Sequence, residues 1–93
     1  MYTQFVKMIQ FTRLVKAEGR LREFNFRKLR MADNESFSVS VCNDRGDRIL
    51  FNMQKKDNGW RILPTELPNW ITQNEQALDE VIEDELRNPT EPY

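Results

Sequence analysis

Residues 37–55, "FSVSVCNDRGDRILFNMQK", decide the fold, because two alternating stretches flank a short polar turn. Apolar side chains occupy the odd positions in both stretches. A three-residue loop from Asp44 to Gly46 sets apolar positions opposite one another, whereas a two- or four-residue loop would oppose apolar to polar side chains. Gly46 supplies the positive φ that a three-residue hairpin needs at its last position. The predicted pairs are Val41 with Ile49, Val39 with Phe51 and Phe37 with Met53.

A second hairpin is predicted to follow directly. Asn58-Gly59 is a strong signal for a two-residue turn, and it leads Trp60 and Ile62 onto the same apolar face. Pro64 ends this short strand, because proline cannot donate to a strand ladder.

The stretch "EFNFRKLR", residues 23–30, precedes the first hairpin and allows two interpretations. It is either a nucleic-acid-binding strand with aromatic and basic side chains, or a strand with its apolar face on a core. Alternation places Phe24 and Phe26 on the same side as the apolar face of the hairpins. Burial of an aromatic side chain stabilises a fold by about 2–3 kcal/mol. We therefore expect both phenylalanines in the core.

Residues 67–87, "LPNWITQNEQALDEVIEDELR", carry one apolar stripe at helical spacing and predict one long amphipathic helix. Pro68 suits its first turn, while Thr72 and Glu75 form a capping box if the helix starts later. We expect residues 88–93 to be a flexible tail. The helix carboxylates repel one another at i to i+4 spacing, which favours a solvated or partner-facing acidic stripe over a metal site or an acid–base pair. They are Asp79, Glu80, Glu83, Asp84 and Glu85.

The basic N-terminal segment, residues 1–22, is ambiguous. It is either a helix that Gly19 stops or a strand that pairs with residues 20–30 through a turn at 17–19. Its β-branched and aromatic content favours the strand.

These elements predict a single α+β domain over residues 1–93. An antiparallel meander of four to five strands, mainly residues 23–63, packs on one long C-terminal helix in two layers.

Composition excludes several classes of function. The chain has no histidine, which removes histidine-dependent triads and the common zinc sites, so we expect no enzyme, cofactor or metal. Its one cysteine, Cys42, is expected to be a small packed residue. No apolar run reaches the roughly 20 residues of a membrane span, and the N-terminus lacks the pattern of a secretory signal. A cytoplasmic location without membrane contact is therefore expected.

Charge is distributed unevenly along the chain. Residues 1–31 hold eight basic and two acidic side chains, whereas residues 32–93 hold six basic and thirteen acidic ones. Such a dipole steers a polyanion to one end, or it draws two copies or two parts of one copy together. With the outer sheet face polar and basic, the candidate ligand or partner surface comprises Arg13, Lys16, Arg20, Arg22, Asn25, Arg27, Asn52, Gln54 and Arg61.

The order of elements over residues 23–88, four strands followed by a helix, resembles the Whirly, transcriptional-coactivator and Pur-alpha families. This resemblance implies single-stranded nucleic-acid binding through the basic segment and the outer sheet face. Leu29, Leu50 and Leu63 on that face predict instead a dimer surface. We expect a small non-enzymatic binding or assembly module that acts through this face, with a homodimer or another protein as partner. Single-stranded nucleic-acid binding is the alternative.

Overall fold

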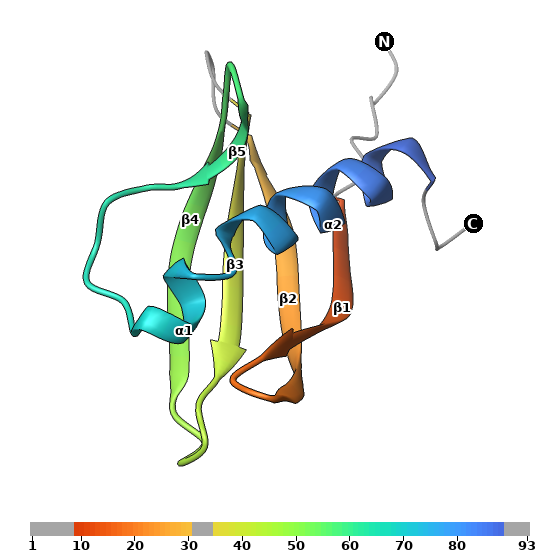
Figure 1. Ribbon diagram of the computed structural model, residues 1–93. Helices are drawn as coiled ribbons and strands as arrows, with labels where there is room; N and C mark the ends of the chain where they lie inside the picture. Colours follow the sequence, from red (N-terminus) through yellow and green to blue (C-terminus); the bar gives the residue numbers. More distant parts are fainter. Residues whose placement is uncertain (1–8, 31–34, 89–93) are drawn as a thin grey trace, which may run out of the picture.

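The computed structural model describes residues 9–30 and 35–88 and confirms the α+β class. Its five strands form one antiparallel sheet in the order β1-β2-β3-β4-β5, and the helical C-terminal part lies across one face of that sheet (Figure 1). The elements are β1 (Gln10–Ala17), β2 (Arg20–Arg30), β3 (Glu35–Cys42), β4 (Arg48–Lys56), β5 (Gly59–Ile62), α1 (Asn69–Thr72) and α2 (Glu75–Arg87).

The N-terminal segment is a strand over residues 10–17. It pairs with β2 through a two-residue turn, in which Glu18 and Gly19 have φ values of 55° and 76°. Two successive positive φ angles are typical of the type I′ turn, whose twist matches that of the flanking strands. Residues 1–8 of the predicted basic segment lie outside the described residues.

The register of the central hairpin is the predicted one. Val41 pairs with Ile49, and the loop ends at Gly46 with a φ of 87°. The side-chain oxygen of Asn43 accepts hydrogen bonds from the main-chain N–H groups of Arg45 and Asp47, both at 2.9 Å. The hairpin is therefore fixed by strand register and by local turn chemistry together.

The turn between β4 and β5 is displaced by one residue from the predicted one. Lys56 pairs with Gly59, so the two turn residues are Asp57 and Asn58. Both registers keep the same side chains on the apolar face, but the observed one sets Ile62 beside Met53 instead of beside a lysine. Apolar packing thus decides between the two registers.

The predicted helix over residues 67–87 is in fact two helices. Residues 73–74 separate α1 from α2, and Pro68 takes the N-cap position before α1 rather than its first turn. The predicted capping box is wrong. Thr72 bonds within α1, to the carbonyl of Asn69 at 3.2 Å, and the Glu75 carboxylate accepts the main-chain N–H of Ile62 at 2.8 Å. The predicted tail, apart from its first residue, lies outside the described residues.

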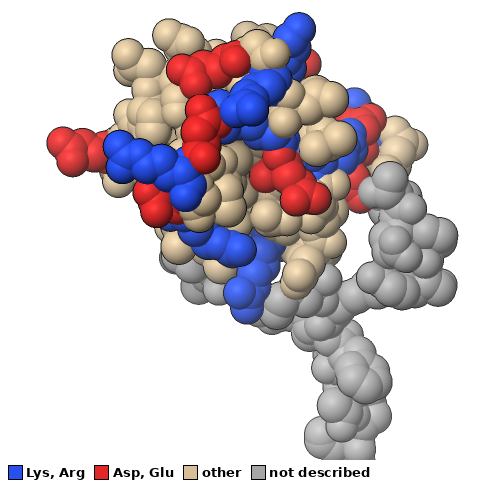
Figure 2. Space-filling model, turned by 90° about the horizontal axis from the view of Figure 1, so that it is seen from below, with Lys and Arg blue, Asp and Glu red and all other residues tan. Residues whose placement is uncertain are grey.

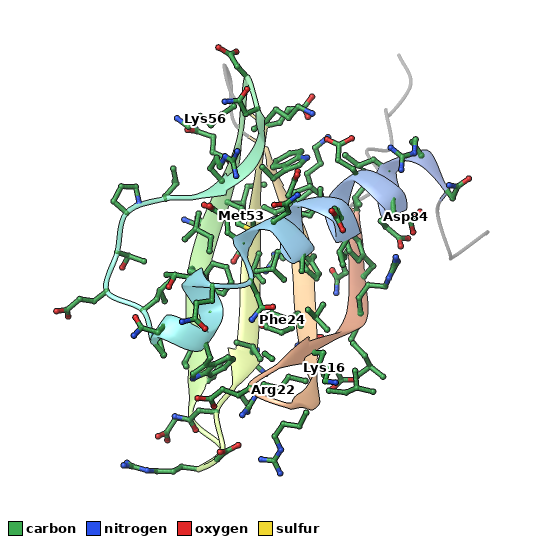
Figure 3. All side chains as sticks on the ribbon, in the orientation of Figure 1. Lys16, Arg22, Phe24, Met53, Lys56 and Asp84 are labelled. Atoms are coloured by element: carbon green, nitrogen blue, oxygen red, sulfur yellow. The ribbon has the colours of Figure 1, made fainter. Side chains whose placement is uncertain are left out.

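The core lies between the sheet and the helices, as predicted. Phe24 and Phe26 are fully buried there, with exposed fractions of 0% and 1%, and Figure 3 shows Phe24 beneath α2. Leu78 and Ile82 of α2 belong to the same cluster, and Trp70 packs against it. The other buried apolar residues of the cluster are Val15, Phe37, Val39, Val41, Phe51, Met53, Trp60 and Ile71.

Candidate interaction surface

The helices cover one face of the sheet (Figure 1), and carboxylates of α2 also cover its β5 edge. The opposite sheet face is therefore the candidate surface. Glu75, Asp79 and Glu83 recur every fourth residue and lie along β5. Asp79 accepts the main-chain N–H of Trp60 at 2.9 Å, Glu75 accepts that of Ile62 at 2.8 Å, and Glu83 accepts the Trp60 indole N–H at 3.1 Å. The carboxylates accept the main-chain N–H groups that an additional strand would otherwise bond. They therefore cover an edge at which another chain could pair.

Ion pairs extend this attachment across the sheet. Lys55 lies 2.7 Å from Glu83, and their hydrogen bond lowers the pKa of the glutamate and raises the pKa of the lysine. At the far end of α2, Arg13 pairs with Asp84 at 2.7 Å and with Glu85 at 3.2 Å. The acidic stripe predicted to face solvent or a partner therefore largely faces the sheet of its own chain. The uneven charge of the sequence is partly neutralised within the fold.

Arg13, Arg20 and Arg22, three of the nine predicted surface residues, form internal ion pairs and lie away from the outer face. A fourth, Arg61, stays on the outer face but also pairs with Glu75 of α2, at 3.6 Å. Arg22 is only 8% exposed, and its guanidinium lies 4.4 Å from the ring centre of Trp70. Arg20 and Arg22 both contact the carboxylate of Asp44, at 2.7 and 3.1 Å. Arg13 and Arg22 point to the helix-facing side of the sheet, and Arg20 lies at the end of the sheet. None of these three arginines belongs to the outer face.

The other six share the outer face of the sheet, the face opposite the helices. Strand register groups them in rows: Arg27 and Asn52 flank Ser38, while Gln54 lies opposite Arg61. This half of the face is polar and basic. The six residues are Lys16, Asn25, Arg27, Asn52, Gln54 and Arg61.

The outward-facing side chains of β3 are short and polar. They are Ser36, Ser38 and Ser40, and Ser36 and Ser40 are only 3% and 6% exposed between the neighbouring strands β2 and β4. The alternating serines of "SFSVSV" are the sequence signal for this polar row.

Three leucines stand out from the same face. Leu14, Leu21 and Leu50 are 62%, 64% and 63% exposed, and we refer to them as the leucine patch. Leu50 stands apart from the other two, because it lies on β4 in the row of Asn25 and Ser40. Leu14 lies opposite Glu23 and Leu21 lies opposite Lys16, so the first two leucines are diagonal neighbours across β1 and β2. The sequence interpretation named Leu50 together with Leu29 and Leu63, which are half-buried. It missed Leu14 and Leu21, which alternation identifies once strands β1 and β2 are known to cover residues 10–17 and 20–30.

The aromatic side chains of the described residues all belong to the helix-facing side of the sheet or to α1. The outer face within residues 9–30 and 35–88 therefore offers no ring for a base to stack on. These aromatic residues are Phe11, Phe24, Phe26, Phe37, Phe51, Trp60 and Trp70.

Cys42 is exposed, and the expectation that it is packed is wrong. It ends β3 on the outer face, opposite Arg48 and beyond the last residue that pairs with β2. Strand alternation correctly placed Cys42 on the outer face. The cysteine is exposed because β2 does not pair with β3 at this position.

The chain matches no protein-family model, no curated protein and no solved structure. The described residues contain no group of three or more cysteine, aspartate or glutamate side chains that could hold a metal ion. The helices described are too short or too polar to cross a membrane.

Proposed function

We propose that this protein is a small non-enzymatic assembly module that self-associates through its outer sheet face, with the leucine patch at the centre of the contact. The observation that carries the proposal is the exposure of Leu14, Leu21 and Leu50, each above 60%, on one face. An antiparallel sheet that faces water usually alternates apolar residues inward with polar residues outward. Leu14 and Leu21 are exposed neighbours on one sheet face, and contiguous exposed apolar side chains are typical of an interaction surface.

The apolar contribution is comparable with the cost of association, whereas a micromolar dimer requires about 8 kcal/mol of net binding free energy. Complete burial of a leucine contributes about 1.5–3 kcal/mol, so covering the exposed part of each of these leucines contributes about 1–2 kcal/mol. A two-fold contact buries the patch of both copies, which gives about 6–12 kcal/mol before the cost of association. That cost is about 4–15 kcal/mol, and polar contacts at the rim must supply the remainder.

The charges around the patch favour a second copy as the partner. Glu23 lies opposite Leu14, Lys16 lies opposite Leu21, and Arg48 lies two residues from Leu50 on β4. A two-fold interface must be self-complementary, and a patch that carries both an acid and bases meets that condition. Glu23 of one copy is then placed to face Lys16 or Arg48 of the other.

Sedimentation equilibrium tests the proposal. We expect a reversible dimer at about 100 μM and mainly monomer in Leu50→Lys, since this change places like charges across the two-fold axis. Leu50 is 63% exposed, so the substitution leaves the core intact. Leu86→Lys on α2 is the matched control and should behave as the wild type. A wild type that stays monomeric, or an equally associated Leu50→Lys, contradicts the proposal.

Single-stranded nucleic-acid binding is a second candidate, supported by the basic half of the outer face. Arg27, Lys56 and Arg61 lie there among amide side chains. Without stacking rings, affinity would come from phosphate contacts, and three such contacts give a logarithmic salt slope of about −2.

Fluorescence anisotropy with a labelled single-stranded oligonucleotide tests this candidate. Arg27→Glu should weaken binding, whereas Leu50→Lys should preserve it, which separates this activity from self-association. Absence of binding at about 50 mM salt, where phosphate contacts are strong, removes the candidate.

A further inference from the structure

The sheet divides at the end where the β1–β2 and β3–β4 turns lie. Pairing between β2 and β3 stops at Asn25 and Ser40, although β2 continues to pair with β1 and β3 with β4 beyond that point. Residues 20–24 and 41–44 therefore face each other without pairing, and Figure 1 shows the two strands spreading apart toward this end. We refer to this opening as the split.

The split is a polar pocket of about 430 Å³. In an antiparallel sheet, main-chain N–H and C=O groups point alternately to the neighbours on the two sides. The groups of β2 and β3 that point into the split thus have no strand partner there, and such groups bind water or a polar ligand. The charged residues that line the pocket are three arginines, Arg20, Arg22 and Arg48, and two acids, Glu23 and Asp44, so its net charge is positive.

An anion of the chain itself occupies the mouth of the split. The carboxylate of Asp44, on the β3–β4 turn, contacts Arg20 at 2.7 Å and Arg22 at 3.1 Å. The hydrogen bond from Arg22 lowers the pKa of Asp44, so the carboxylate is charged at neutral pH. Figure 2 views the molecule from this end and shows acidic and basic side chains interleaved.

Arg22, which contacts Asp44, is also held in place by Trp70 and by the main chain of β1. Arg22 is 8% exposed, its guanidinium lies 4.4 Å from the ring centre of Trp70, and its Nε donates to the carbonyl of Ala17 at 3.3 Å. A guanidinium fixed in this way recognises carboxylate or phosphate oxygens with little further loss of conformational freedom. Arg48, which has no ion pair among the described residues, adds a cation to the pocket lining.

We propose that the split binds a small anionic ligand, a molecule with a carboxylate or phosphate group, in the place that the Asp44 carboxylate occupies. Asp44 is 61% exposed on its side chain, so it can leave the arginines without disturbing the core. The aspartate then acts as an internal competitor, present at a high effective concentration because it belongs to the same chain. The pocket shares Leu21, Glu23 and Arg48 with the surface proposed for self-association, so the test is carried out on the Leu50→Lys variant as well as on the wild type.

Removal of the competitor gives the sharpest test. Asp44→Asn keeps the shape of the side chain and removes its charge. We expect inorganic phosphate or succinate to bind about two- to thirty-fold more tightly, the range implied by the loss of two ion pairs of an exposed carboxylate. Asp47→Asn is the control, because Asp47 lies on the same turn and has no ion pair in the described structure. Arg48→Gln should weaken binding.

Amide nitrogen–proton NMR titrations, at constant ionic strength set with sodium chloride, give the readout. The expected result is saturable shifts confined to residues 20–25 and 40–44, larger at a given anion concentration in Asp44→Asn. Tighter binding of phosphate assigns the natural ligand to phosphorylated compounds, and tighter binding of succinate assigns it to carboxylates. No saturable shift with either anion in Asp44→Asn, or equal affinity in Arg48→Gln, overturns the proposal. The same titration on Leu50→Lys separates this result from any failure to self-associate.

Discussion

Asp79→Ala tests whether the helix carboxylates close the sheet edge. Asp79 accepts the main-chain N–H of Trp60 at 2.9 Å, and its carboxylate also lies 2.9 Å from the position that a Cβ on Gly59 would take. A hydrogen bond to a charged acceptor contributes about 1.5–3 kcal/mol to stability. Alanine restores part of this through its higher helix propensity and through relief of like-charge repulsion along α2.

Glu80→Ala provides the matched control, because Glu80 is exposed on the same helix and its removal brings similar gains in propensity and repulsion. The difference between the two variants isolates the hydrogen bond, and we expect it to be about 1–3 kcal/mol. Urea unfolding followed by tryptophan fluorescence should show an unfolding midpoint about 1 M or more lower in Asp79→Ala. Equal midpoints for the two variants would show that the carboxylate does not hold β5.

Leu78→Ala should reduce the free energy of unfolding by about 2–5 kcal/mol, because Leu78 is completely buried between α2 and the sheet. Urea unfolding measures this loss, and an unchanged stability would mean that the helix does not cover the sheet. The pair between Lys55 and Glu83 predicts a pH dependence of stability. The folded-state pKa of Glu83 lies below its ordinary value of 4.5, so its contribution to stability is present above that pH and disappears as pH falls through the folded-state pKa. The difference in urea midpoint between the wild type and Glu83→Gln should therefore be present at neutral pH and vanish in acid, and a constant difference would contradict the role of the charge.

The register of two paired strands was predictable from the sequence where an error of one residue would move apolar side chains to the other face of the sheet. A shift of one residue in the central hairpin would have moved Phe51 out of the core, so alternation and Gly46 were sufficient there. The turn between β4 and β5 differs from the prediction by a shift that keeps every residue on its own face. The two registers differ in which residues lie opposite one another, such as Ile62 opposite Met53, and alternation does not report these pairs.

The helix shows a different limit of sequence interpretation. Charged residues at i to i+4 spacing predict repulsion and a wet surface, yet Glu75, Asp79 and Glu83 face the unpaired edge of β5. Their four-residue spacing is visible in the sequence. Glu75 and Asp79 accept from main-chain N–H groups, which no sequence pattern marks, and Glu83 accepts from the Trp60 indole and from Lys55. Glu75, which the sequence offered as part of a capping box, is likewise bonded to the sheet and not to the N-terminus of its own helix.

The candidate surface was identified only in part. Alternation places Asn25, Arg27 and Asn52 on the outer face correctly, because both neighbouring strands were already assigned. Arg22 was included for its charge, although its position in β2 turns it toward Trp70 and the core. The split between β2 and β3 had no sequence signal, because the twist and spreading of a sheet depend on all of its strands together.

Leucine methyl NMR over a dilution series measures the central claim most directly, because it identifies the buried face as well as the presence of a dimer. If the outer sheet face mediates self-association, the methyl signals of Leu14, Leu21 and Leu50 should shift with protein concentration. Those of Leu78 in the core and Leu86 on α2 should remain fixed. Concentration-independent signals for all three patch leucines, or shifts confined to Leu86, would contradict assembly through this face.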